Sequence, residues 1–139
     1  MVKTEEEIAI MKEGGSILAG ILKNLKKETK AGIVTQELED LARQMIKEAG
    51  AEPAFLGFND YPAVLCVSIN EEVVHCLPSK RMIEPGDLVS LDLGIRFKGL
   101  NVDSALTVLV EPSADGKQKD LKERLMKVTK ECLDMGVSM

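Results

Sequence analysis

Apolar residues recur at helical spacing in the first part of the chain and predict two amphipathic helices. The first opens with a capping box at Thr4, and the second opens at Thr35 and ends at Gly50. Each stripe marks a face that packs against other elements. Gly14 and Gly15 lower helix stability, so we expect a close backbone approach there. The stripes consist of Ile8, Met11, Gly15, Leu18, Ile21, Leu22 and Leu25 in the first helix, and of Leu38, Leu41, Ala42, Met45, Ile46 and Ala49 in the second.

The pattern then changes to a period of two, which predicts a β-hairpin with arms 88–97 and 100–110 joined by Lys98 and Gly99. One face of the hairpin is apolar throughout and is expected to face the core. The other face is small or polar. The apolar face carries Val89, Leu91, Leu93, Ile95, Phe97, Val102, Leu106, Val108 and Val110, and the polar face carries Ser90, Asp92, Gly94, Asn101, Asp103 and Ala105.

Three further segments complete the predicted elements. Residues 63–69 predict a buried strand, and residues 84–87 predict a β-turn with a proline at its second position. Residues 111–117 are expected to form a loop before a third helix. The apolar face of that helix consists of Leu121, Leu125, Val128, Cys132 and Met135.

Two aspartates share the polar face of the hairpin. With Lys98 and Gly99 as the turn, Asp92 faces Ala105 and Asp103 faces Gly94, so the aspartates stand diagonally, roughly 7 to 8 Å apart or somewhat less. A register shift of one residue would separate them onto opposite faces. A solvated antiparallel face also carries carboxylates, and spacing alone supports both interpretations equally. The small and polar neighbours, with Gly94 leaving space beside Asp103, favour a cation site.

Composition indicates a soluble globular protein of one domain. The chain has 139 residues, of which 45% are hydrophobic and 29% charged, and its net charge of −5 argues against nucleic acid or anionic membrane as partners. No segment suits a membrane span or a signal peptide, so we expect a cytoplasmic protein. Cys66, Cys76 and Cys132 form neither a disulfide framework nor a zinc motif. We interpret Cys66 and Cys76 as core thiols, although either could bind a soft metal.

Four stretches of the chain, in this order and spacing, resemble the pita-bread metallopeptidases, and most closely the methionine aminopeptidases. The resemblance implies an α+β fold, the N-terminal half of the pita-bread fold, with an antiparallel sheet covered by helices. The implied function is removal of N-terminal methionine from peptides and nascent proteins. The stretches are Leu56-Gly-Phe-Asn-Asp-Tyr-Pro62, Val67-Ser-Ile-Asn-Glu-Glu-Val-Val-His75, Pro85-Gly-Asp-Leu-Val-Ser-Leu-Asp-Leu-Gly94 and Asn101-Val-Asp-Ser104.

The resemblance also implies the roles of individual residues. In that family two aspartates, a histidine and two glutamates hold two divalent metal ions, of Co, Mn, Fe or Zn, and Asp92 and Asp103 match the aspartates. His75, which we expect at a strand end, matches a separate histidine that contacts the substrate and assists proton transfer. A lone histidine is otherwise more often structural than catalytic. The pocket for the methionine side chain matches Phe55, Phe58, Tyr61 and Cys66.

The remaining ligands of the family site come from a C-terminal half related to the first by pseudo-two-fold symmetry. His75 is the only histidine in these 139 residues. We therefore expect residues 1–139 to be a single partial domain without that half, to bind metal weakly and to have no useful activity alone. Cys76 and Val102 stand where the family commonly has glycine or another small residue, which affects fine pocket geometry.

Other functions and partners stay open at this point. A proline-specific peptidase of the same fold shares the aspartates, and a non-catalytic pita-bread binding module would fit the half-length chain. The expected ligand is the N-terminus of a peptide or nascent chain. We expect a homodimer through the face that the other half would cover, unless the third helix folds over that face.

Overall fold

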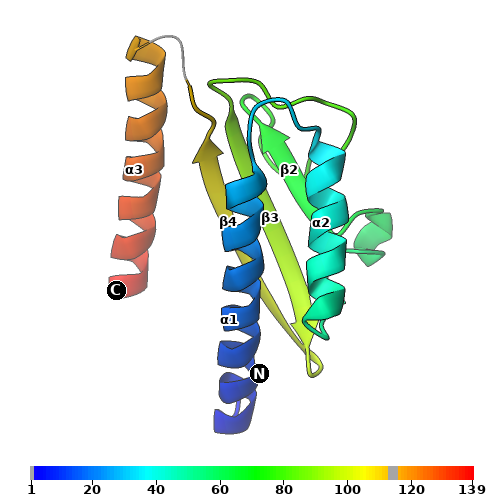
Figure 1. The fold of residues 1–139 in the computed structure, drawn as a ribbon. Coiled ribbons are helices and arrows are strands. Elements are labelled where there is room, and N and C mark those ends of the chain that lie inside the picture. Colours follow the sequence, from blue (N-terminus) through cyan, green and yellow to red (C-terminus); the bar gives the residue numbers. More distant parts are fainter. Residues whose placement is uncertain (1, 113–115) are drawn as a thin grey trace.

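The computed structural model describes residues 2–112 and 116–139, which form a four-stranded antiparallel sheet with three helices (Figure 1). Strand β3 is central: β1 and β2 pair with one of its edges and β4 with the other. The α+β class predicted from the sequence is confirmed. In chain order the elements are α1 (Glu5–Glu28), α2 (Thr35–Glu48), β1 (Glu52–Pro53), the 3₁₀ turn η1 (Phe58–Asp60), β2 (Leu65–Ile69), β3 (Leu88–Phe97), β4 (Leu100–Leu109) and α3 (Gly116–Ser138).

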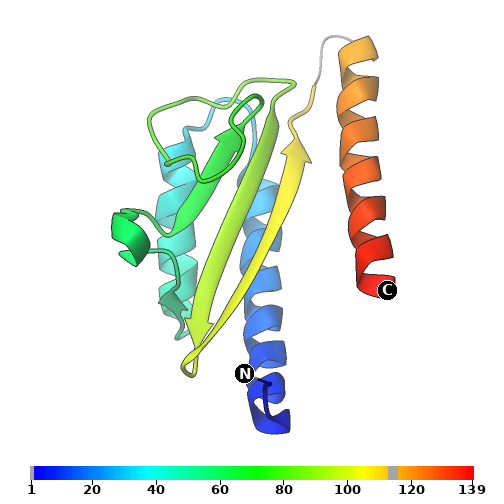
Figure 2. The same cartoon turned by 180° about the vertical axis from the view of Figure 1, so that it is seen from behind.

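Helices α1 and α2 lie side by side on one face of the sheet, and the opposite face carries the η1 turn and loops (Figures 1 and 2). The apolar stripes of both helices meet the apolar face of β3, as their periodicities predict. Burying aliphatic side chains is the main stabilising contribution of this layer. The core is formed by Leu18, Ile21, Leu22, Leu25, Leu38, Ala42, Ile46, Leu65, Val67, Ile69, Ile83, Val89, Leu91, Leu93 and Ile95, among others.

The hairpin of β3 and β4 has the register that the sequence predicts. Asp92 pairs with Ala105, and Gly94 pairs with Asp103. The turn residues Lys98 and Gly99 both have positive φ angles, of 47° and 84°, which is the backbone of a two-residue type I′ turn. Gly99 adopts this conformation without steric cost, and the turn thereby fixes which residues share a face.

The first helix confirms its capping box but corrects one detail of its packing. The Thr4 side chain accepts from the backbone of Glu7, and the Glu7 side chain accepts from that of Thr4. Of the two glycines, only Gly14 lies at a close approach: a β-carbon there would lie 3.3 Å from Cβ of Phe97. A β-carbon at Gly15 would have no neighbouring atom within 4 Å, so the predicted close backbone approach at Gly15 is wrong.

The long segment between β2 and β3 is attached to the start of α2. The hydroxyl of Thr35 accepts a hydrogen bond from the backbone of Ser79 at 2.8 Å, and the backbone of Gln36 donates to the carbonyl of Ser79 at 2.9 Å. Helix α2 begins at Thr35 as expected, with Val34 as its N-cap residue. These contacts fix the part of the segment around Ser79 to the N-terminal end of α2.

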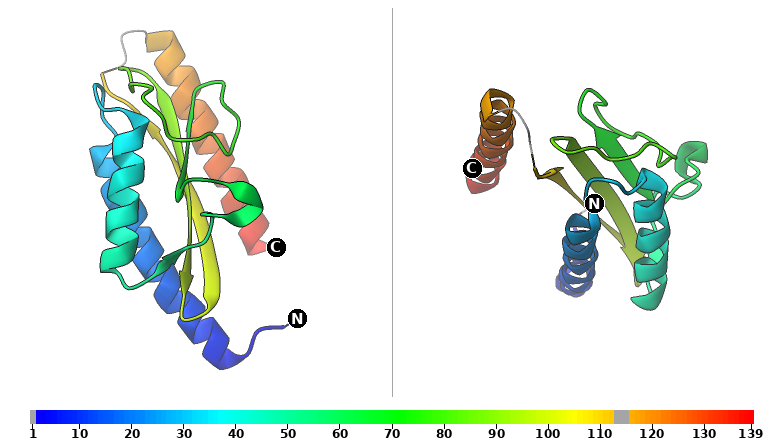
Figure 3. Two further views of the ribbon diagram at one scale, coloured as in Figure 1. Left: turned by 90° about the vertical axis from the view of Figure 1, so that its right-hand side faces the viewer. Right: turned by 45° about the horizontal axis from the view of Figure 1, so that its top comes forward.

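Helix α3 stands beside β4 rather than over the open face (Figure 3). No residue of α3 is buried, and Leu121 is 66% exposed. The side chain of Lys122, in α3, donates a hydrogen bond to the carbonyl of Gly86 at 2.6 Å. The predicted loop 111–117 is shorter than expected, because Gly116 already belongs to α3, and its residues 113–115 lie outside the described part. Within residues 2–112 and 116–139, no helix has the length and hydropathy needed to span a bilayer.

Candidate metal and substrate site

The aspartate pair lies on the open face of the sheet. Asp92 is half-buried on β3 and Asp103 is exposed on β4, and the register places them diagonally across the two strands. Burial raises the pKa of Asp92, and the neighbouring charge of Asp103 raises it further, while His75 opposes these effects. Two neighbouring carboxylates repel each other, and a bound cation would relieve that repulsion. Their oxygen ligands suit a divalent metal ion, so the pair fits part of a metal site.

His75 reaches the same face from the segment after β2, not from a strand end as predicted. The backbone of Val67 donates to the carbonyl of Cys76 at 3.0 Å, which holds this segment against β2. His75 has a φ of 58°, an uncommon conformation for a residue other than glycine. Such conformations concentrate at functional sites, where surrounding structure holds them in place.

One cavity of about 340 Å³ unites all the residues that the sequence singled out. Its volume is in the range of small-ligand pockets. The aspartates and His75 form a polar side, and aromatic rings form an apolar side. Asn59 also lines the cavity and was not among the predicted residues. The lining residues are Phe55, Phe58, Asn59, Tyr61, Cys66, His75, Asp92 and Asp103.

Gly94 makes room for an aromatic ring rather than for open space beside Asp103. A β-carbon at Gly94 would lie 2.6 Å from Cε1 of Phe55, a distance that real side chains do not adopt. The ring of Phe55 therefore packs directly on the backbone of β3, next to the aspartate pair. Close backbone approach is a recurrent reason for glycine inside a strand.

Tyr61 connects the aromatic side of the cavity to β2. Its hydroxyl donates to the carbonyls of Leu65 at 3.1 Å and Cys76 at 3.3 Å. Burial, more than any neighbour, raises the pKa of Tyr61 and also that of the Cys66 thiol. Tyr61 thus stays a neutral hydrogen-bond donor at physiological pH.

Glu39 supports the site in a way that the sequence analysis missed. It is 2% exposed, and its carboxylate accepts from the backbone of Val64 at 3.0 Å and of Leu65 at 2.9 Å. Arg43 contributes an ion pair at 2.6 Å. Glu39 thereby fixes the start of β2, at Leu65, and the residue before it, Val64. The sequence offered one signal for a buried role of Glu39: this residue directly follows Leu38 of the apolar stripe of α2.

The chain is similar in sequence to known metallopeptidases. The family model described as metallopeptidase family M24 matches residues 9–139. Methionine aminopeptidase 1 of Bacillus subtilis (strain 168) is 42% identical over 135 residues, and the match covers 97% of this chain and 52% of that protein. The methionine aminopeptidase of Aquifex aeolicus is 41% identical, with 94% and 51% covered. The chain thus spans about half the length of these relatives.

Solved structures give the same result for the fold. The methionine aminopeptidase of Thermotoga maritima superposes with a TM-score of 0.90 at 36% identity, covering 100% of this chain and 54% of that one. The prolidase of Pyrococcus furiosus has a TM-score of 0.75 at 27% identity, with 93% and 36% covered. Both matches confirm that the chain has about half of a pita-bread fold. From its sequence, its fold and the family match over residues 9–139, this chain belongs to metallopeptidase family M24.

Proposed function

We propose that residues 1–139 supply one half of a methionine aminopeptidase site. The observation that carries this proposal is the aspartate pair at the polar side of a cavity whose other side is aromatic. Such a cavity accommodates an apolar side chain while placing the adjoining polar backbone at the carboxylates. Among the solved relatives, the higher TM-score and identity of the methionine enzyme support this proposal over a prolidase-like one.

Asp92 and Asp103 would hold divalent ions of Co, Mn, Fe or Zn. When bound, such ions lower the pKa of a coordinated water and stabilise developing negative charge at the reacting carbonyl. The chain's own contribution is orientation. Asp92 and Asp103 are fixed by paired strands, which keeps their carboxyl groups together without help from a loop.

The cavity walls would bind the substrate's first residue. The rings of Phe55, Phe58 and Tyr61 exclude water from one side and provide apolar contact area for a methionine side chain. His75 lines the same cavity, where its imidazole would hydrogen-bond the scissile peptide and assist proton transfer. Tyr61 keeps its ring in place through its bonds to Leu65 and Cys76.

Two carboxylates are too few ligands for two metal ions, so a complete site needs groups from outside residues 1–139. We therefore expect this chain alone to release no measurable methionine from a Met-Ala-Ser peptide with Mn²⁺ or Co²⁺ added. Loss of several direct ligands costs more than the roughly 10 to 100-fold typical of one outer-shell partner. Turnover by the isolated chain that Asp103→Asn abolishes would contradict this expectation.

A chimera tests the proposed function itself. Residues 1–139 replace the matching segment of the Bacillus subtilis protein, and release of methionine from Met-Ala-Ser is compared with cleavage of an Ala-Pro dipeptide. We expect methionine release only, lost on Asp92→Asn or Asp103→Asn. Cleavage of Ala-Pro alone would favour the proline-specific alternative. A folded chimera that binds the peptide but cleaves neither substrate would favour a binding module.

The expected homodimer stays a prediction. Its structural basis is the open face of the sheet together with the exposed apolar side chains of α3, including Leu125 and Val128. Exposed apolar area of this kind favours association. Light scattering at micromolar concentration measures it directly, and a mass of one chain at every concentration would rule the dimer out.

A further inference from the structure

We propose that Cys66, His75 and Asp92 form a separate, mononuclear site for a thiophilic divalent ion such as Zn²⁺. This site shares Asp92 with the aspartate pair but uses a thiolate and an imidazole in place of Asp103. It does not depend on the function proposed above, because it concerns the binding of a metal and not the cleavage of a peptide.

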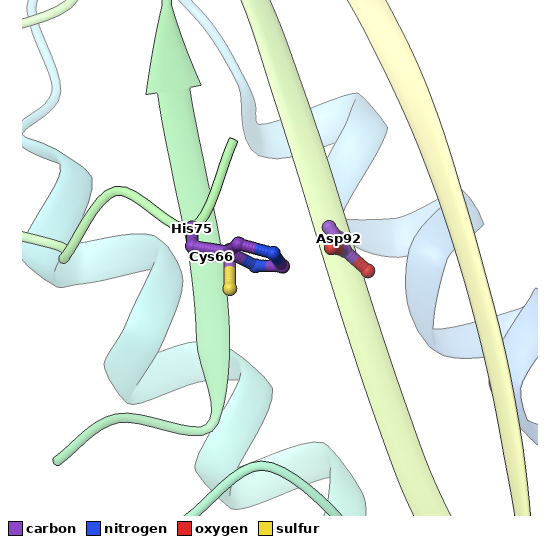
Figure 4. A group of neighbouring side chains, drawn as sticks. All are labelled: Cys66, His75 and Asp92. Atoms are coloured by element: carbon purple, nitrogen blue, oxygen red, sulfur yellow. The ribbon is translucent and has the colours of Figure 1, made fainter. Parts of the chain in front are cut away.

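The geometry of three side chains carries the inference. The Cys66 sulfur, an imidazole nitrogen of His75 and a carboxylate oxygen of Asp92 all lie within 4.8 Å of one another. Figure 4 shows the His75 ring directed toward β3, where Asp92 lies, with the Cys66 sulfur close beside it. In a tetrahedral zinc site, bond lengths of about 2.0 to 2.3 Å place ligand atoms roughly 3.4 to 3.6 Å apart. Closing the cluster around an ion therefore takes side-chain shifts of about 1 Å.

Cys66 and Asp92 lie on paired strands and are held rigidly, whereas His75 lies on a loop segment and can adjust its position. Cys66 and Asp92 are direct cross-strand partners in the β2–β3 register, so their side chains leave the same face of the sheet. His75 is exposed and comes from the segment that the Val67 to Cys76 hydrogen bond ties to β2. Its imidazole can rotate toward the other two without moving the sheet.

The ligand types select the class of metal. One thiolate, one imidazole and one carboxylate suit Zn²⁺ and other borderline or soft ions, whereas Mg²⁺ and Mn²⁺ prefer oxygen ligands alone. A water molecule can take the fourth position, as it does in zinc sites with three protein ligands.

The other two cysteines provide matched controls. Cys76 is half-buried, and its thiol lies 3.7 Å from the carbonyl of Val74, to which it donates weakly. Cys132 is exposed on α3. Neither belongs to the cluster of Cys66, His75 and Asp92.

The proposed site and the aspartate pair both use Asp92, so they exclude each other. An ion held by Cys66, His75 and Asp92 lies in the same cavity and takes Asp92 away from a site with Asp103. Thiophilic ions are therefore expected to compete with Mn²⁺ for this chain. Excess Mn²⁺ should displace Zn²⁺ poorly, because it gains little from a thiolate.

Cobalt spectroscopy tests the site, since Co²⁺ replaces Zn²⁺ in such sites and absorbs in the near ultraviolet when a thiolate is bound. We expect Co²⁺ to give this charge-transfer band with one equivalent bound per chain. Cys66→Ser should abolish the band, and Cys132→Ser should leave it unchanged. His75→Ala should weaken the affinity about tenfold or more, and Asp103→Asn should retain the band. A band that is absent, or that survives Cys66→Ser, would overturn the proposal.

A second measurement uses the unaltered chain and so does not depend on how a variant folds. Alkylation of each cysteine is followed by mass spectrometry with and without Zn²⁺. We expect Zn²⁺ to slow the alkylation of Cys66 at least tenfold while Cys132 reacts at its original rate. Equal rates for Cys66 with and without Zn²⁺ would count against the site, and Mn²⁺ at the same concentration should give no protection.

Discussion

The two faces of strand β3 are built from alternate residues of one sequence and behave as different environments. On the face covered by α1 and α2, Leu91 and Leu93 are completely buried. On the other face, one residue away, Asp92 is half-buried among polar groups and its pKa is raised by that burial. The covered face stabilises the fold, whereas the open face carries groups whose arrangement costs stability. The contrast predicts how substitutions on each face affect the protein.

The largest effect is expected on the covered face. Leu91→Ala removes a side chain with no exposed area and leaves a cavity, which costs about 2 to 5 kcal/mol of the free energy of unfolding. Urea unfolding followed by circular dichroism measures this cost. A loss below about 1 kcal/mol would show that the core relaxes into the space, and the contrast between faces would then be weak.

Glu39 sharpens the contrast because it is a carboxylate buried on the helix-covered side. Unlike Asp92, it has donors for its oxygens: the backbone of Val64, the backbone of Leu65 and Arg43. Glu39→Ala leaves two buried N–H groups without partners, at about 1 to 3 kcal/mol each. We expect a loss of roughly 2 to 6 kcal/mol, with Asp40→Ala, on the exposed side of α2, as a control near zero. Equal effects of the two substitutions would contradict this account.

Gly94→Ala tests the contact between the open face and the aromatic side of the cavity. Its new methyl group would overlap Phe55, so the ring must move or the strand must shift. Overpacking of this kind costs about 1 to 3 kcal/mol. We also expect weaker binding of methionine-containing peptides, measured by calorimetry on the chimera. Gly94→Ala combined with Phe55→Leu should recover part of the stability, and no recovery would mean that another contact is responsible.

The smallest effect is expected at Asp92, where a substitution should raise the stability of the fold and not lower it. A raised carboxyl pKa means that the folded state favours the protonated form. The group's contribution to stability is therefore fully present at low pH and is lost as the pH rises through the raised pKa. At pH 7, Asp92→Asn removes this cost, so the melting temperature should rise slightly, while at pH 4 the gain should shrink. A lower melting temperature at pH 7 would show that the carboxylate stabilises the fold.

Most of the fold followed from local signals in the sequence. The hairpin register was predictable because Lys98 and Gly99 suit a type I′ turn and the alternation on both arms agrees with it. The apolar stripe of α1 was predictable from its periodicity. Which of Gly14 and Gly15 lies at the close approach was not, because this depends on Phe97 from a distant strand. Periodicity carries no information about such partners.

The candidate site was predictable only in part. The aspartate pair follows from the hairpin alone, and the cavity residues followed from a family resemblance. The path of the segment carrying His75 depends on long-range bonds, such as that of Ser79 to Thr35, which no local pattern reveals. The proximity of Cys66 to Asp92 depends on the β2–β3 register, and β2 is separated from β3 by a long loop. Glu39 was missed because its partners, the backbone groups of Val64 and Leu65, are distant in the sequence.

The two-residue turn at Lys98 and Gly99 also bears on the order in which the chain folds. A hairpin closed by so short a connection loses little chain entropy and forms in about 1 to 10 μs, long before strands distant in sequence find each other. We expect the β3–β4 hairpin to be structured in the folding transition state and β2 to dock later. Asp92 and Asp103 would then be neighbours from the earliest native contacts, whereas Cys66 and His75 would join them only as the last strands assemble.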